Sequence, residues 1–423
     1  ALGGSVPKRV VLPVEIDLPA EKVFAEFHAG TEEAKQEAST TMAFARLVRN
    51  LMKDKSFGSR VVPIIPDEAR TFGMDPFFSQ FKIYSPQGQN YNSVDAEFVL
   101  SYKEAADGQI LEEGITEAGA MASFTAAGTS YATSGQPMLP LYTFYSMFGF
   151  QRVGDSIWSF ADNRGRGFLL GATAGRTTLN GEGLQHEDGH SHVLAATFPN
   201  VVAYDPSFAF EIALVVKDGM RRMYDENEDV FYYLTVHNEN YAQPPMPEHE
   251  GVSVEQGVIE GLYPFERAED RKDLHVQLFG SGSIMMQVLA ARDLLAEKFG
   301  VSADIWGATS YQLLRRRAVE TERWNRLNPT ETPRPVWIQD VLKDAEGPII
   351  AASDFMKLVP DQIARWVPNT FISLGTDGFG MSDTREALRR HFEVDAESIA
   401  AAALYGLHQD GKVSAEEVAQ AYV

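Results

Sequence analysis

Glu117 is the residue whose neighbours in the sequence point most directly to chemistry. It is the only charged residue between Ile115 and Tyr131, a stretch rich in alanine and glycine. One interpretation is structural, because the helix dipole favours an acid in the first turn of a helix. The other is functional: apolar surroundings favour the neutral form of a carboxyl, which can then hold or donate a proton near neutral pH. The other motifs of the chain favour the functional interpretation.

Three histidines follow a long glycine-rich segment, in the sequence LQHEDGHSH that ends at His192. His186, Glu187 and His190 match the HExxH spacing of zinc peptidases, which works only when both histidines share one face of a helix. The Asp-Gly pair between them is typical of a turn, so zinc is disfavoured and no metal ligand is assigned. We expect His186 to project from an active-site loop, where an imidazole transfers protons or binds an anion. The alternative is that these are loop histidines with a purely structural role.

Two acids, Asp67 and Glu68, come directly after the apolar segment 60–65, which we expect to form a strand. Polar residues just past the end of a buried parallel strand lie where open α/β sheets bind ligands. An N-cap followed by a first-turn acid explains the same pair equally well. The residues alone leave both interpretations open.

Segment 137–150 carries an unusually dense group of aromatic residues and is predicted to be a strand. Such a group usually belongs to a core. It can also form a platform for a flat heterocycle, because stacked rings gain more than buried area alone. The aromatic residues concerned are Tyr142, Phe144, Tyr145, Phe148 and Phe150.

Alternating strands and helices are needed to position these residues, and the periodicity of the chain predicts them. The predicted strands are 60–65, 137–150, 201–204, 231–236, 274–279, 303–307, 348–352 and 371–374, and the predicted helices are 32–55, one beginning near Glu117, 208–224, 284–299, 361–366, 383–391 and 398–408. Strands that alternate with helices indicate parallel α/β sheets. A linker rich in proline and glutamate at 240–256 predicts a domain boundary near Glu250.

Composition sets the outer limits. The 423 residues suggest two or three domains, and 44% of them are hydrophobic. The formal net charge of −22 disfavours nucleic acid and anionic membranes as partners, because like charges repel. The chain has no cysteine, which excludes disulfides and fits a cytoplasmic setting. No apolar stretch is long enough to span a bilayer.

Six motifs, taken together, identify a family. They are PDEARTFGM from Pro66, KIYSPQGQNY from Lys82, GQILEEGITEAGA from Gly108, FYSMFGFQR from Phe144, GRTTLNGEGLQHEDGHSH from Gly175 and LGTDGFGMSD from Leu374. They closely resemble the homodimeric type of pyruvate dehydrogenase, the thiamine-diphosphate-dependent decarboxylating component of the pyruvate dehydrogenase complex. The resemblance covers nearly the whole chain. The glycine-rich segment with its histidines is specific to that enzyme type, more than to transketolases at large.

The resemblance implies a transketolase-like α/β fold in three domains, of which this chain resembles the last two. Residues 32–250 correspond to the three-layer pyrimidine-binding domain and 251–423 to the transketolase C-terminal domain, with 1–31 as a connector. The family's first domain holds the diphosphate of the cofactor through Mg²⁺ with a Gly-Asp-Gly motif and a later asparagine, and we find no such motif here. Because the chain also lacks an initial Met, we expect it to be a piece of a longer polypeptide.

Roles for individual residues follow from the resemblance by position. Glu117 resembles the glutamate that hydrogen-bonds the aminopyrimidine ring of thiamine diphosphate, and Phe148 resembles the residue stacked on that ring. Residues that line the reaction chamber in the family are matched by Tyr145, Asp67, Glu68 and His186. Of these, His186 is the candidate to meet the substrate carboxylate or the incoming lipoyl group. His190 and His192 share its loop without an assigned role.

The function implied by the resemblance is oxidative decarboxylation of pyruvate with reductive acetylation of the lipoyl group of dihydrolipoamide acetyltransferase. The lipoyl and binding domains of that protein are then partners, together with the missing N-terminal domain and a second copy of the subunit, since the family's cofactor lies between two subunits of a homodimer. This chain alone is expected to be inactive. The alternatives are a fragment that only dimerises or docks, and the disfavoured zinc peptidase.

Overall fold

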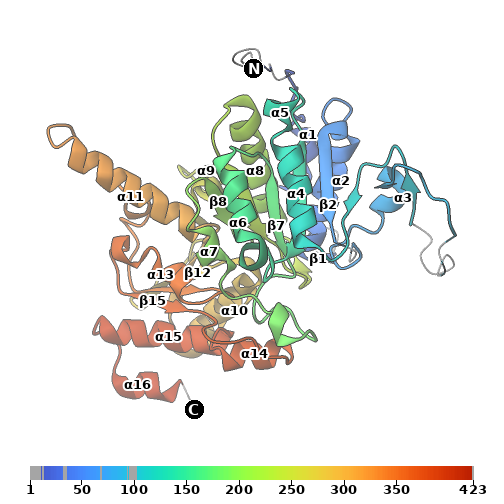
Figure 1. Ribbon diagram of the computed structural model, residues 1–423. Coiled ribbons are helices and arrows are strands. Elements are labelled where there is room, and N and C mark those ends of the chain that lie inside the picture. The colour runs from blue at the N-terminus through green and yellow to red at the C-terminus, as the bar shows by residue number, and fades with distance from the viewer. Residues whose placement is uncertain are drawn as a thin grey trace.

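The computed structural model describes residues 11, 14–31, 36–66, 69–92, 94 and 102–421. Two main β-sheets, the first parallel and the second parallel except for one edge strand, dominate it, and each is flanked by helices (Figure 1). This confirms the α/β class predicted from the sequence, in which one α/β unit follows another along the chain.

The first sheet is built from strands that are buried along almost their whole length, as expected when helices cover both faces. In spatial order its strands are β5 (Leu111–Glu112), β2 (Val61–Ile65), β6 (Leu139–Tyr145), β7 (Phe168–Ala172), β9 (Phe231–Thr235) and β8 (Val201–Tyr204). All neighbouring pairs are parallel. The flanking helices pack in pairs, α4 (Glu117–Gly128) with α6 (Gly149–Asp162) and α2 (Thr40–Lys53) with α8 (Ala209–Met220) (Figure 1).

The second sheet has five strands. Their order is β11 (Tyr263–Glu266), β13 (Ser302–Gly307), β12 (His275–Gly280), β14 (Ile349–Ala352) and β15 (Phe371–Leu374). Four are parallel, and β11 at the edge runs antiparallel to β13. The main helices here are α10 (Met285–Leu294), α11 (Tyr311–Leu327), α14 (Arg385–His391) and α15 (Ala396–Gln409).

Several predicted strands are confirmed, whereas one helix was missed and another has different bounds. Strands β8 and β15 have the predicted bounds. Helix α11 was not predicted, because its buried positions all lie in its first eight residues and are interrupted there by the arginine run 315–317. Figure 1 shows α11 reaching away from both sheets. The helix predicted at 361–366 is instead two short turns, α13 (Leu358–Asp361) and η6 (Ala364–Trp366).

The predicted strand 137–150 is wrong at its C-terminal end, and this error concerns the site. Strand β6 ends at Tyr145, and α6 begins at Gly149. A Cβ atom at position 149 would lie 2.0 Å from the ring of Phe144, so the chain turns here on a glycine against an aromatic side chain. Phe148 is therefore the N-cap of a helix, and the aromatic run is divided between strand, turn and helix.

Helix α1 (Lys22–Ala25), near the beginning of the described residues, packs onto the first unit against α2 and α8. Its Val23 and Phe24 are buried. Helix α2 begins later than predicted, at Thr40, because the Ser39 side chain accepts a hydrogen bond from the Met42 N–H and caps it. Of the predicted helix 32–55, residues 32–35 lie outside the described residues.

A buried polar layer joins the two sheets where the carboxyl ends of their strands meet. Asp205 follows β8, and its Oδ1 lies 2.8 Å from Nε2 of His237, which follows β9. Ser281, which follows β12 of the second sheet, donates to the other carboxylate oxygen over 2.8 Å. Burial opposes the ionised carboxyl, but the neighbouring His237 imidazole outweighs it and lowers the pKa of Asp205. The two units are thus held together by polar contacts that sequence periodicity does not reveal.

Candidate active site

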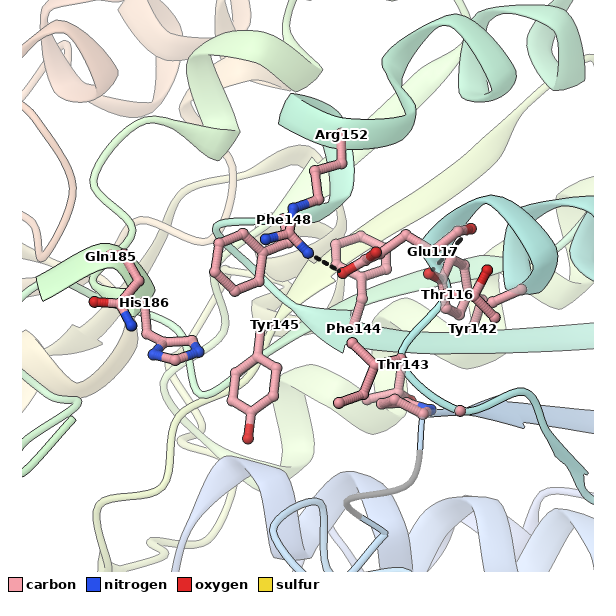
Figure 2. A pocket seen from close by; sticks show the side chains of 14 residues that line it. Thr116, Glu117, Tyr142, Thr143, Phe144, Tyr145, Phe148, Arg152, Gln185 and His186 are labelled. Carbon is pink, nitrogen blue, oxygen red and sulfur yellow. Dashed lines mark hydrogen bonds and ion pairs between the residues drawn. The ribbon is translucent and has the colours of Figure 1, made fainter. Parts of the chain in front are cut away.

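A cavity of about 250 Å³ lies at the carboxyl end of β6, at the edge where parallel sheets bind ligands. It is bounded by the end of β6, the head of α4, the turn into α6 and the loop after β7 (Figure 2). Its lining includes Pro66, Thr116, Glu117, Tyr142, Tyr145, Phe148, Arg152, Gln185 and His186. Four of the residues singled out in the sequence are therefore brought together: Glu117, Tyr145, Phe148 and His186.

Glu117 is the first residue of α4. The helix starts here because the Thr116 hydroxyl caps it, accepting from the Gly119 N–H over 3.3 Å. The Glu117 side chain is 21% exposed and faces Arg152, whose Nη1 donates to its Oε1 over 2.7 Å. The expectation of purely apolar surroundings is wrong, since a guanidinium from α6 crosses the cavity to meet the carboxylate.

The turn between β6 and α6 places two aromatic rings beside the imidazole of His186. Its ring centre lies 5.1 Å from that of Tyr145 and 5.2 Å from that of Phe148, in tilted and edge-on arrangements (Figure 2). The His186 side chain is 24% exposed, so it borders the cavity without being sealed inside it. The histidine thus contacts the rings of Tyr145 and Phe148 and borders the same cavity as Glu117.

The loop that carries His186 is not a helix over the HExxH motif. Leu184–His186 form one 3₁₀ turn, extended backbone follows, and α7 (Ser191–Ala195) begins only after His190. The His190 Nε2 contacts the Gln151 side chain at 2.8 Å, and the buried His192 contacts Thr235 at 2.9 Å. The shared helical face that a zinc peptidase requires is absent from this segment. Within the described part of the chain, no three histidine or acidic side chains come together as a metal site.

Asp67 and Glu68 lie outside the described residues, so their predicted place in the chamber stays a prediction. The preceding residue, Pro66, does line the cavity.

Arg152 is the member of the site that sequence reasoning missed. Its Cζ lies 3.9 Å from the centre of the Phe148 ring while the same guanidinium hydrogen-bonds Glu117. The sequence contained a helical spacing that could have revealed it. Arg152 follows Phe148 by four residues, and residues four apart on a helix are neighbours. Predicting a strand through Phe150 placed Phe148 on a strand that ends before Arg152, which concealed their helical spacing.

The guanidinium of Arg152 is itself a flat group in this cavity, and its contacts show what a flat ring would meet there. A guanidinium is planar and carries N–H donors, and here it lies over an aromatic face while donating to a carboxylate. A flat heterocycle with a protonated ring nitrogen needs the same two contacts. The geometry of Phe148 and Glu117 therefore suits such a ring.

Among the described residues, none of the helices combines the length and apolar character that crossing a bilayer requires.

Both α/β units match models of known protein families. Residues 14–244 match the family model described as pyruvate dehydrogenase E1 component middle domain, and residues 261–395 match the transketolase-like C-terminal domain. The chain is 51% identical over 424 residues to the pyruvate dehydrogenase E1 component of Pseudomonas aeruginosa. It is 50% identical over 423 residues to the protein of the same name from Escherichia coli K12. The chain is covered at 100% and 99% in these two matches, but it spans only 47% of the length of each relative.

Solved structures agree on the fold. A transketolase from Leishmania mexicana superposes with a TM-score of 0.66 at 14% identity, covering 94% of this chain and 49% of that one. A split-gene transketolase, described as an inactive β4 tetramer, superposes with a TM-score of 0.55 at 15% identity. It covers 88% of this chain and 98% of that one, so a separate polypeptide of this extent exists among proteins of this fold.

Proposed function

The chain belongs to the family of pyruvate dehydrogenase E1 components, and from that membership we propose that it supplies the aminopyrimidine half of a thiamine-diphosphate-dependent active site. The observation that carries this proposal is the pairing of Phe148 and Glu117 around one flat, hydrogen-bond-donating group, the Arg152 guanidinium. When bound, thiamine diphosphate supplies the electron sink that stores the carbanion left by decarboxylation.

In this proposal the chain's own residues orient the cofactor ring and control its proton. Phe148 stacks on the ring, which fixes its plane. Glu117 hydrogen-bonds the ring nitrogen and holds a proton there, which is the acid–base function a carboxyl at this position can perform. When the cofactor ring binds, it replaces the Arg152 guanidinium as the hydrogen-bond donor to the Glu117 carboxylate. Tyr145, with Asp67 and Glu68, lines the chamber beyond the ring.

His186 is proposed to act on the substrate side. It borders the cavity next to Tyr145 and Phe148 and is partly exposed. An imidazole there can bind the carboxylate of pyruvate or take and give a proton as the acetyl group passes to the lipoyl group of dihydrolipoamide acetyltransferase. His190 and His192 are directed to α6 and to the buried junction, so the proposal gives them no chemical step.

We assign the remaining half of the site to a polypeptide segment that is not part of this chain. The chain spans less than half the length of its curated relatives, and the Mg²⁺ and diphosphate are proposed to bind the part of the relatives that it does not match. A homodimer is proposed as the working unit. Supporting this, α4 leaves Ala118, Ala122 and Ala126 exposed at four-residue intervals, so a second backbone can approach this face closely.

The test uses a protein of the relatives' full length that contains this chain. It is incubated with pyruvate, thiamine diphosphate, Mg²⁺ and a lipoyl domain, and the lipoyl domain is weighed by mass spectrometry. We expect pyruvate-dependent acetylation of the lipoyl group. A lipoyl domain that stays unmodified, while the protein binds the cofactor, would exclude pyruvate dehydrogenase activity.

The second candidate is a chain that only assembles. It is favoured by the split-gene transketolase, of which this chain covers 98% and whose tetramer is described as inactive. The same assay separates the two, because an assembly chain shows no turnover even when the other half is supplied.

A further inference from the structure

We propose that Glu187 is a positioning residue for His186, through which the loop between β15 and α14, residues 375–384, sets where the imidazole lies. This inference rests on the proposed function, because it concerns the histidine assigned to the substrate side. It adds that the second α/β unit takes part in the site by holding a loop of the first.

The side chain of Glu187 spans the two units. It is fully buried, and its Oε2 accepts a hydrogen bond from the backbone N–H of Met381 over 2.6 Å. Its other carboxylate oxygen is buried with no hydrogen-bond partner among the described residues. A buried carboxyl with one free oxygen is costly for stability alone, so its place beside His186 calls for a further explanation.

The backbone of the second unit also touches the turn that carries the histidine. A Cβ atom at Gly380 would lie 2.6 Å from the Leu184 carbonyl oxygen and 2.8 Å from the Glu187 Cβ, which leaves room only for glycine. Two residues further, the Ser382 hydroxyl donates to the Glu182 carbonyl. Residues 380–382 of the loop are therefore packed against residues 182–187, the segment that contains the 3₁₀ turn.

Arg176 also ties the loop 375–384 to the backbone of Glu187. It is 5% exposed, and its guanidinium donates to the carbonyls of Thr376 and Gly378, the latter over 2.6 Å. Its Nε donates to the backbone carbonyl of Glu187 over 3.5 Å. A Cβ atom at Gly189 would lie 2.3 Å from the guanidinium carbon, so this clamp also depends on a glycine. The backbone and the side chain of Glu187 are thus both tied to the second unit.

His186 has few anchors of its own. Its Nδ1 is buried without a hydrogen-bond partner among the described residues, and the Glu182 carboxylate lies 3.5 Å away in poor alignment. Its other contacts are the rings of Tyr145 and Phe148, which tolerate sliding. The position of the imidazole is then set by its turn. A displacement of about 1 Å at a reacting group can cost roughly a hundredfold in rate.

A merely structural role for Glu187 is the competing explanation, and Glu211 is the matched control for it. Burial raises the pKa of both carboxyls to about 7. Glu211 also joins the units, because its Oε1 accepts from the Tyr263 hydroxyl over 2.6 Å. Neither carboxyl lines the cavity, but Glu187 directly follows His186, which does. Loss of either carboxylate removes a buried tether between the units, while only one of them adjoins His186.

The test follows His186 by NMR in this chain, with ring-labelled histidine and the resonance assigned by His186→Gln. We expect Glu187→Ala to move or broaden that resonance and Glu211→Ala to leave it in place at a similar loss of Tm. Glu187→Gln, which keeps an acceptor for the Met381 N–H, should restore it. An unmoved resonance in Glu187→Ala, at a Tm loss equal to that of Glu211→Ala, would reduce Glu187 to a structural tether.

A second pair of variants covers the case in which Glu187→Ala does not fold. Met381→Pro removes the N–H donor, while Met381→Ala truncates the same exposed side chain and keeps the donor. Only the proline variant should shift the His186 resonance; equal spectra for the two would overturn the proposal. These readouts need no turnover. A shifted resonance in a full-length protein without pyruvate activity would therefore refute the proposed function and leave the positioning role standing.

Discussion

The Arg152 guanidinium donates a hydrogen bond to the Glu117 carboxylate over 2.7 Å. Through this contact the start of α6 reaches the start of α4 across the cavity (Figure 2). Phe148 lies under the same guanidinium, so the cation contacts the acid and the ring at once. The consequences for Glu117, His186, the isolated chain and the buried Glu211 can each be measured.

Replacing Glu117 with Gln should abolish the acid–base function while keeping the shape of the side chain. The amide oxygen can still accept from Arg152, so we expect the fold and the Tm to be retained. In the full-length enzyme turnover should fall a hundredfold to ten-thousandfold, about 3 to 5 kcal/mol. The measurement is hydrogen–deuterium exchange at the reactive thiazolium carbon of bound cofactor. Glu113→Gln, four residues earlier in the connection before α4 and outside the cavity lining, is the control. Near-normal exchange in the Glu117 variant would contradict its assignment.

Replacing His186 with Ala should leave cofactor binding and metal content unchanged in the full-length enzyme, because its loop lacks the helix of a zinc site. The loss is expected in steps that involve pyruvate or the lipoyl acceptor. Rapid-mixing kinetics would follow formation of the first pyruvate adduct and acetyl transfer to a lipoyl domain separately. His190→Ala is the control, since His190 faces Gln151. Bound zinc that disappears in both variants, with both steps intact, would favour the peptidase alternative.

The isolated 423-residue chain should bind thiamine diphosphate weakly and show no decarboxylase activity. The reason is that the described cavity offers contacts for a ring, and no diphosphate and metal motif was found in the sequence. Calorimetric titration with cofactor and Mg²⁺ measures this directly, with Glu117→Gln as the control for binding at the ring site. Tight, Mg²⁺-dependent binding would show that the diphosphate site lies within this chain.

Glu211 should make the protein less stable as pH rises through neutrality. Burial raises the pKa of its carboxyl to about 7. Between about pH 4.5 and 7 the unfolded chain has lost this proton and the folded chain keeps it, so stability falls as pH rises by up to about 1.4 kcal/mol per pH unit. Glu211→Gln removes the titration. Urea unfolding at pH 5 and pH 8 should show the Gln variant gaining stability relative to the native chain; a constant difference would mean that Glu211 is already ionised at pH 5.

The sequence by itself was enough for the α/β class, for most strands and for four members of the site. Runs such as Val201–Tyr204 are buried on both faces, and their apolar character alone marks them as strands of a parallel sheet. Glu117, Tyr145, Phe148 and His186 were identified from motifs that resemble a family, and the structure places them around one cavity.

Only the tertiary structure decided which partners these residues have. Glu187 and the Met381 N–H are 194 residues apart along the chain, and Arg176 reaches carbonyls 200 and 202 residues away. Sequence periodicity reports which face of an element is buried, but it carries no information on which distant backbone lies against that face. Arg152 was missed for a local reason. The end of β6 is set by the close approach of Gly149 to the Phe144 ring, a steric contact between backbone and side chain that the sequence pattern does not show.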